Sequence, residues 1–207
     1  LRDLPPAVYT EQQWAVLGAI VRLLPRATAL LWTVFGARGQ CDFTEISQSA
    51  VRALGPDAQP SDLALALDYR IRHLLVDEFQ DTSFAQFELL AKLTRGWAAD
   101  DGNTLLAVGD PMQSIYRFRE AEVGLFAEAM QRGIGEVRLV ELGLVVNFRS
   151  DAAIVAWVNR TFSRLMPADP GVVAAGRVPY AASQAHLAAT ASSGGEVVWH
   201  PNFILRD

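Results

Sequence analysis

Apolar residues recur at helical spacing through the first part of the chain. A capping box that begins at Thr10 precedes apolar positions spaced like one helix face, which predicts a helix that Pro25 ends or kinks. A second helix is expected over 26–37. A third starts near Asp42, with Glu45 three residues later in the position that favours a helix N-terminus.

The apolar pattern changes near residue 71. Residues 71–76 and 104–108 form two short apolar runs rich in branched side chains, which predict buried strands. A helix opened by the Ser83 and Gln86 capping box lies between them, so strand, helix and strand form a parallel βαβ unit. The elements expected around this unit are a turn-rich loop over 55–60, a short helix over 63–69 capped by Ser61, and a loop over 100–103.

The remaining pattern predicts a second, less regular part of the chain. Gly133 and Gly135 mark a break and the best candidate for a domain boundary. The expected elements are a helix over 121–132, a strand over 137–146, a helix from Ser150 or Asp151 through Phe162, an irregular tail over 167–195 and a last strand over 196–200. The fold class is therefore α/β.

Composition limits the kind of protein. The chain has 207 residues, of which 51% are hydrophobic and 20% charged, which suits a globular core rather than disorder. The net charge of -5 argues against DNA binding by charge alone in this piece. Cys41 is the single cysteine, which excludes an internal disulfide and a multi-cysteine zinc site and favours a reducing, cytoplasmic compartment.

The sequence has 17 arginines and one lysine, Lys92, which follows Leu-Leu-Ala. A phosphate-binding loop needs a Gly-rich turn followed by Lys and Ser or Thr, so Lys92 is not such a lysine. The chain begins with Leu, without a signal peptide, and we expect it to be a piece of a longer protein. No apolar run is expected to reach the length of a membrane span, and no membrane partner is expected.

Polar side chains follow both predicted strands. Asp77 and Glu78 follow the first, and Asp110 follows the second, with Gln113 close behind. Ligands of parallel sheets bind beyond the carboxyl ends of the strands, where one carboxylate can hold a hydrated Mg²⁺ and a second can deprotonate a water. The alternatives are an acidic strand end that faces solvent and a Gly-Asp-Pro turn that only reverses the chain.

Three segments resemble the motifs of one family. Residues 76–82 (VDEFQDT) resemble motif II of the UvrD/Rep-type superfamily 1 DNA helicases, residues 109–119 (GDPMQSIYRFR) resemble motif III, and residues 147–150 (NFRS) resemble motif IV. Their order and spacing also fit. The sequence of residues 42–46 (DFTEI) and that of motif III resemble the RecB/AddA-like helicase–nuclease subunits in particular.

The resemblance implies a RecA-like P-loop NTPase core, incomplete here, that uses ATP and Mg²⁺. It also implies a role for each matched residue. These roles are Asp77 as Mg²⁺ ligand, Glu78 as catalytic base, Gln113 as γ-phosphate sensor, Arg149 as arginine finger from the second motor domain, Gln80 and Asp81 as links from motif II to its neighbours, Asp110 as a nucleotide-site residue, and Tyr116, Phe118 and Arg119 as the lining of the single-strand path.

Departures from the family pattern affect the DNA path most. The family often has Trp where Phe118 stands, Gly where Glu120 stands and Tyr where Phe148 stands. Glu120 adds a negative charge near the expected DNA contact. Tyr116 and Phe118 also have a plain alternative as core aromatics, because aromatic side chains are mostly buried.

The resemblance also implies a division of the chain. Residues 1–70 are expected to be a helical segment that leads into the first motor domain and includes helices of an accessory subdomain. Residues 71–134 are expected to be the later part of the first motor domain, and 135–207 the start of the second. The expected function is that of a piece of an ATP-dependent 3′-5′ DNA helicase that acts on single- and double-stranded DNA with a partner nuclease or helicase subunit. Two alternatives are a non-catalytic helicase-like scaffold and an unrelated Mg²⁺-dependent phosphohydrolase that uses Asp77 and Glu78 alone.

Overall fold

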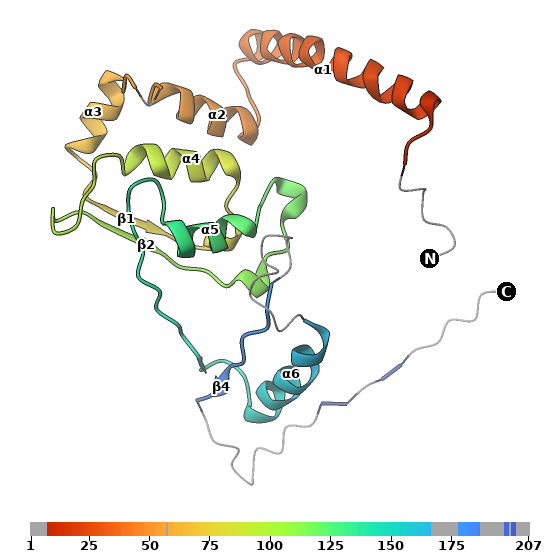
Figure 1. Cartoon of the computed structure of the whole chain (residues 1–207), viewed down its shortest axis with the longest axis vertical. Helices are drawn as coiled ribbons and strands as arrows, with labels where there is room; N and C mark the ends of the chain where they lie inside the picture. The colour runs from red at the N-terminus through yellow and green to blue at the C-terminus, as the bar shows by residue number, and fades with distance from the viewer. Residues whose placement is uncertain (1–7, 57, 167–177, 187–196, 199, 202–207) are drawn as a thin grey trace. The chain divides into compact units, whose positions relative to one another are not determined.

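The computed structural model describes residues 8–56, 58–166, 178–186, 197–198 and 200–201. The chain divides into two compact units, 1–48 and 49–207. The elements, labelled in Figure 1, are α1 (Glu11–Arg38), α2 (Phe43–Ala53), α3 (Asp62–Asp68), β1 (His73–Val76), η1 (Phe79–Asp81), α4 (Phe84–Leu93), β2 (Thr104–Ala107), η2 (Pro111–Gln113), η3 (Arg117–Arg119), α5 (Gly124–Arg132), β3 (Val146–Asn147), α6 (Ala152–Leu165) and β4 (Gln184–Ala185).

The first unit contains one long helix. The Thr10 capping box is present at the start of α1, but Pro25 lies inside the helix, so the expected division into two helices is wrong. A proline removes one backbone hydrogen bond, and the good helix formers on both sides carry the helix through it. Near its other end, Trp32 Nε1 donates a 2.9 Å hydrogen bond to Glu45 Oε2 on α2.

The length of α1 also corrects the expectation about membrane spans. The helix contains an apolar window of mean hydropathy 1.5, none of it buried, and it is long and apolar enough by length and composition to cross a membrane. The expectation failed because the helix continues through Pro25, so that the apolar residues on both sides of it form one long helix. Core helices of soluble proteins and signal sequences can be equally long and apolar, so this property alone does not assign α1 to a bilayer.

The centre of the second unit is the predicted βαβ unit. β1 and β2 pair in parallel, with His73 opposite Thr104 and Val76 opposite Ala107, and α4 connects them. Both sequence-predicted strands and the capped helix are confirmed, with slightly shorter strands. The α/β fold class is also confirmed.

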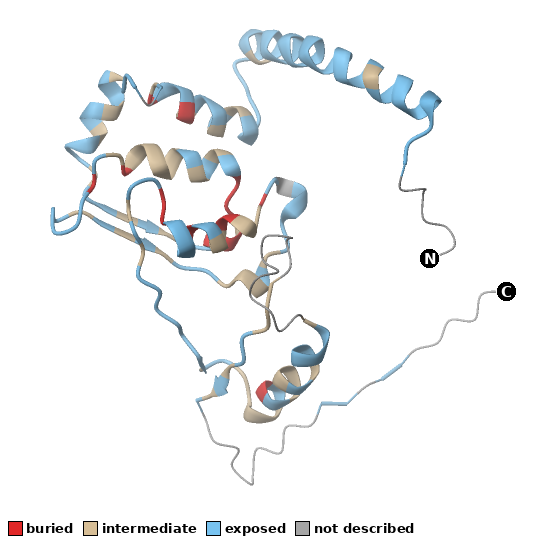
Figure 2. Ribbon diagram, in the orientation of Figure 1, coloured by how far each residue is buried: buried red, intermediate tan, exposed pale blue. Residues whose placement is uncertain are grey.

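The core lies on one side of this sheet. Phe79, Ala129 and Ile134 are at most 2% exposed and pack with residues of β1, β2, α4 and α5. The Phe79 ring lies 5.7 Å from that of Phe126 on α5, and Figure 2 shows buried residues gathered around η1 and α5. The core therefore fixes the segment that follows β1.

The other side of the sheet is open in the described chain. Leu75 is 71% exposed and Leu106 is 53% exposed. The residues that alternate with them along the two strands, Leu74, Val76, Leu105 and Ala107, are half-buried and belong to the opposite face. The prediction that these strands are buried is therefore wrong for the face that carries Leu75 and Leu106. An apolar run alone does not show how many layers cover a strand, because that depends on chain packed from elsewhere.

The predicted strand over 137–146 is mostly absent. Residues 138–145 have no regular structure, and only Val146 and Asn147 form a strand, β3. Leu142 and Leu144 are 80% and 94% exposed. A strand needs a hydrogen-bonded neighbour. Val137 makes only an isolated bridge with Ile134, and a paired strand begins at Val146.

That neighbour, β4, lies in the tail that was expected to be irregular. β3 and β4 pair in parallel across α6, which forms a second, small βαβ unit. Asn159 on α6 accepts a 3.2 Å hydrogen bond from the Ser183 N–H and donates a 2.8 Å bond to the Ser183 carbonyl, which holds the segment before β4. Most of the rest of the tail, 167–177 and 187–195, lies outside the described residues, as do Glu196 and Trp199 of the expected last strand; Val197, Val198 and His200 have no regular structure.

Candidate functional site

The acidic pair lies where the sequence places it, directly after β1. Asp77 and Glu78 are both exposed, and Asp77 Oδ1 accepts a 2.9 Å hydrogen bond from the Glu78 N–H. Glu78 adopts a left-handed backbone conformation with φ 52°. Such a conformation is uncommon for a residue with a Cβ and marks a sharp turn out of the strand, which presents both carboxylates at the sheet edge.

The segment after β2 turns at the same edge. The Asp110 carboxylate caps η2, since Oδ1 accepts a 3.0 Å hydrogen bond from the Met112 N–H. Its other oxygen, Oδ2, accepts a 2.8 Å bond from Gln113 Nε2. The Gly-Asp-Pro sequence therefore does reverse the chain, and the same turn carries Gln113 beside the strand ends.

Gln80 joins the two segments. Its side chain is 2% exposed and uses both ends: Nε2 donates to Glu78 Oε2 at 2.6 Å, and Oε1 accepts from the Asp110 N–H at 3.0 Å. The Ser114 hydroxyl donates a 3.2 Å bond to the Gln80 carbonyl. The structure thus brings Glu78, Gln80, Asp110 and Gln113 into one hydrogen-bonded group.

Asp81 lies next to this group without a described partner for one oxygen. The residue is half-buried, its Oδ1 is buried, and no described residue donates a hydrogen bond to it. A buried acceptor without a donor costs free energy, so such an atom marks a place for a further partner.

Two of the three expected DNA-path residues present aromatic rings after η2. The Tyr116 and Phe118 rings lie 5.9 Å apart, and the side chains are 37% and 77% exposed. The alternative that they are core aromatics does not hold in the described chain. Arg119 ends η3, and its side chain lies outside the described part.

Arg149 lies in the turn between β3 and α6. Asn147 Oδ1 accepts hydrogen bonds from the N–H groups of Arg149 and Ser150 at 2.9 and 2.8 Å, and Asp151 caps α6. Among the residues that the structure describes, no hydrogen bond or ion pair joins Arg149 to the Gln80 group. The residue expected to act as the arginine finger is exposed.

Three residues in or near these segments had no predicted role of their own. Gly109 supplies space for Gln80, and Ser114 holds the Gln80 carbonyl. His186, just after β4, places its ring 4.2 Å from the Phe148 ring. Only the β3–β4 pairing brings these rings together, so no local sequence signal could have found His186.

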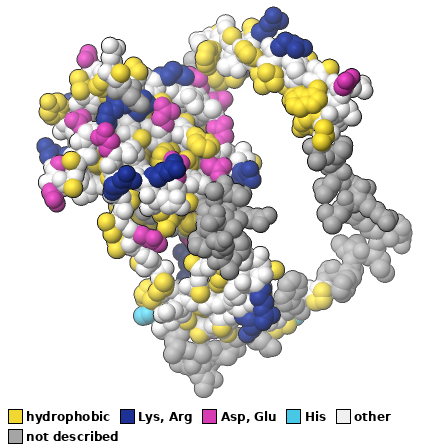
Figure 3. Space-filling view, viewed as in Figure 1, with side chains coloured by type: hydrophobic (Ala, Val, Ile, Leu, Met, Phe, Trp, Pro, Cys, Tyr) yellow, Lys and Arg dark blue, Asp and Glu magenta, His cyan; other side chains and the backbone are white. Residues whose placement is uncertain are grey.

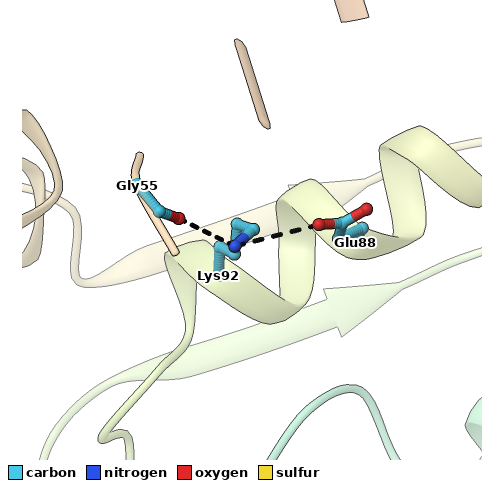
Figure 4. A network of polar contacts seen from close by, with 3 residues as sticks. All are labelled: Gly55, Glu88 and Lys92. Atoms are coloured by element: carbon cyan, nitrogen blue, oxygen red, sulfur yellow. Dashed lines mark hydrogen bonds and ion pairs between the residues drawn. The ribbon is translucent and has the colours of Figure 1, made fainter. Parts of the chain in front are cut away.

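Lys92 has a structural role (Figure 4). Its Nζ donates a 2.9 Å hydrogen bond to the Gly55 carbonyl and lies 3.8 Å from Glu88 Oε1. Its side chain is only 9% exposed. The ammonium joins α4 to the turn after α2, which agrees with the sequence argument that it is not a phosphate-loop lysine.

Comparison with known proteins identifies the family of the chain. Residues 21–132 match the sequence profile of the UvrD/REP helicase N-terminal domain. The chain belongs to the UvrD/REP helicase family.

Individual relatives agree with that family. The chain is 35% identical over 170 residues to an ATP-dependent helicase/nuclease subunit of Bacillus cytotoxicus, covering 79% of this chain and 14% of that protein. It is 33% identical over 165 residues to the protein of the same name from Bacillus mycoides, covering 76% and 13%. The chain therefore spans about one seventh of the length of these relatives. The sequence-based resemblance to the UvrD/Rep and RecB/AddA-like proteins is confirmed.

Asp77 and Glu78 are the candidate ligands for the Mg²⁺ that a nucleotide site would hold. Within the described residues, no group of three or more His, Cys, Asp or Glu side chains could hold a metal ion. Mg²⁺ in nucleotide sites usually takes one or two carboxylates and completes its shell with water and phosphate oxygens. The exposed Asp77 carboxylate at the strand end fits that kind of ligand, with Glu78 beside it.

Proposed function

We propose that this chain forms the motif II and motif III part of an ATP-driven DNA helicase motor with a RecA-like P-loop NTPase core. The observation that supports this most is the hydrogen-bonded group of Glu78, Gln80, Asp110 and Gln113 at the carboxyl edge of two parallel strands. Motor ATPases use that edge for nucleotide chemistry. The domain divisions near residues 70 and 134 remain part of the proposal.

In this proposal Glu78 is the general base. Its Oε2 is engaged by Gln80, and the described residues make no hydrogen bond to its other oxygen, Oε1. Oε1 takes a proton from the water that attacks the γ-phosphate, while the bond from the γ-phosphorus to the β–γ bridging oxygen breaks. Asp77 would hold Mg²⁺, which neutralises charge on the phosphates, and Gln113 contacts the γ-phosphate.

The remaining site residues have supporting roles in the proposed motor. Asp110 fixes the η2 turn that carries Gln113, and the buried Oδ1 of Asp81 accepts a donor from a neighbouring segment. Arg149 acts as an arginine finger when the nucleotide-bound cleft closes between the motor domains. ATP drives this closure because it binds the closed state better than the open one.

Single-stranded DNA is the proposed ligand of the segment after η2. Tyr116 and Phe118 stack on bases, and Arg119 contacts the phosphate backbone. Support comes from the exposure of both rings. The whole protein is proposed to translocate 3′ to 5′ on DNA in the cytoplasm, as a helicase–nuclease subunit that works with a partner nuclease or helicase subunit in repair and recombination.

The Glu78→Gln variant of the complete protein tests the proposal. The amide keeps the shape of the side chain but does not accept a proton from water. We expect ATP binding within about twofold of wild type and hydrolysis lowered by about 10² or more. Glu88→Gln, the same change on an exposed face of α4, is the matched control and keeps wild-type turnover. Hydrolysis of ATP by Glu78→Gln at the wild-type rate would contradict the role of Glu78 and favour a non-catalytic scaffold.

A further inference from the structure

Gln80 is a polar side chain in an apolar place. It lies in η1 and is 2% exposed, next to Phe79, whose ring is part of the core. A buried amide is stable only when its donors and acceptors are used. The partners of Gln80 therefore decide where this side chain lies.

Those partners fix the orientation of the amide. The Glu78 carboxylate can only accept, and it receives the Gln80 Nε2 donor at 2.6 Å. The Asp110 N–H can only donate, and it meets Oε1 at 3.0 Å. An amide turned by 180° would face a donor with a donor and an acceptor with an acceptor, so only one orientation satisfies both ends.

Gly109 makes the close approach possible. A Cβ on Gly109 would lie 2.5 Å from Gln80 Oε1 and 3.0 Å from the Phe79 backbone nitrogen. The φ of Gly109 is not in the positive region, so the glycine is required by space rather than by backbone conformation. The end of β2 and the turn after β1 thus fit together only because this residue has no side chain.

The contacts form a continuous series between two segments. Glu78 accepts from Gln80, Gln80 accepts from the Asp110 N–H, and the Asp110 carboxylate accepts from Gln113 Nε2 at 2.8 Å. The buried Gln80 amide makes the first two of these hydrogen bonds, and the η2 turn holds the Asp110 carboxylate that makes the third. A shift of the η2 turn would therefore move the Glu78 carboxylate.

We propose that Gln80 is a positioning residue for the catalytic base: its buried amide holds one oxygen of Glu78, leaves the other for the attacking water, and links the position of the carboxylate to the turn that carries Gln113. Gly109 supplies the space that this contact needs. The inference rests on the proposed function, because it assigns Glu78 the role of base.

Two substitutions in the complete protein test it. Gln80→Met keeps the length and apolar volume of the side chain and removes both amide hydrogen bonds. Gln80→Glu keeps an oxygen for the Asp110 N–H and loses the donor to Glu78, so it decides the question if Gln80→Met fails to fold. We expect each folded variant to lower kcat by about tenfold or more with KM for ATP within about twofold, because a misplaced group costs rate rather than binding.

A double-mutant cycle separates positioning from general destabilisation. In the Glu78→Gln background the base is already lost, so adding Gln80→Met should lower the residual kcat by less than about twofold. A merely structural role would instead reduce the rate by the same factor in both backgrounds. Gly109→Ala should resemble Gln80→Met, and Gly143→Ala, where an added Cβ meets nothing within 4 Å, should keep wild-type kcat.

The outcomes distinguish this inference from the proposed function. If Glu78→Gln abolishes turnover while both Gln80 variants keep wild-type kcat, Gln80 has no positioning role and the proposed function stands. A rise in KM at constant kcat, or equal losses in both backgrounds of the cycle, also overturns the inference. If Glu78→Gln hydrolyses ATP normally, the proposed function itself fails.

Discussion

At the scale of single residues, Glu78 shows how packing holds an unfavourable backbone. A left-handed conformation costs a residue with a Cβ about 1–3 kcal/mol. Glu78 has φ 52°, and the residues on either side are held by the 2.9 Å bond from the Phe79 N–H to the Val108 carbonyl and the 2.8 Å bond from the Val108 N–H to the Val76 carbonyl. The sheet therefore maintains the turn, and the turn presents the carboxylate.

Lys92 supports a prediction about stability. Replacing it with Met removes the hydrogen bond to the Gly55 carbonyl but keeps most of the buried stem. A charge-assisted hydrogen bond is lost and a carbonyl is left without its donor, so we expect the second unit to lose about 1–2 kcal/mol. Urea unfolding of the 207-residue chain measures this loss. Glu88→Gln, which breaks only the half-exposed ion pair at 3.8 Å, should change the free energy of unfolding by less than about 0.5 kcal/mol. Equal effects of both variants would contradict the prediction.

At the scale of elements, two helices start with the same device. The Ser83 hydroxyl accepts from the Gln86 N–H at 3.4 Å and the Gln86 side chain accepts from the Ser83 N–H at 2.9 Å, and Thr10 and Gln13 repeat this arrangement on α1. α4 packs on the core, whereas α1 has no buried residue. The same cap should therefore matter differently in the two helices.

Ser83→Ala and Thr10→Ala form a matched pair of variants. Loss of the cap hydroxyl costs about 1 kcal/mol. For Ser83→Ala we expect faster amide hydrogen exchange throughout the core around α4, because that helix is part of the cooperative unit. For Thr10→Ala we expect faster exchange only in the first turns of α1. Unchanged exchange in α4 of the Ser83→Ala chain would show that its cap does not support the core.

Local sequence signals predicted most of the elements. They failed where an element depends on contacts with residues far away in the sequence. The capping boxes, the apolar runs of β1 and β2 and the helix end before Gly133 are properties of neighbouring residues, and these predictions are confirmed. β4, by contrast, exists only because β3 lies beside it. The candidate site divides in the same way. Its residue types were visible in sequence, but the contact between Gln80 and Gly109 depends on the packing of segments about 30 residues apart.

At the scale of the whole chain, charge does not indicate a DNA-binding surface. The net charge is -5, and on the face drawn in Figure 3 acidic and basic side chains are interspersed over the second unit. DNA affinity in such a chain would have to come from ring stacking and from contacts made by other parts of the proposed motor, rather than from a broad basic surface. Leu75 and Leu106 on the outer face of β1 and β2 are exposed in the described chain.

The last prediction concerns the 207-residue chain by itself. Its only lysine is held by the Gly55 carbonyl, and its sequence has no Gly-rich turn followed by Lys and Ser or Thr. The acidic residues and Gln113 then have no cradle that holds a triphosphate against them, because phosphate binding needs backbone N–H groups and a cation at the loop. We therefore expect the purified chain to show no Mg²⁺-dependent ATP turnover above that of its own Glu78→Gln variant, which controls for contaminating ATPases. Steady phosphate release that the Glu78→Gln substitution removes would mean that these residues alone form a complete hydrolase, and the motor interpretation would then give way to a stand-alone Mg²⁺-dependent phosphohydrolase.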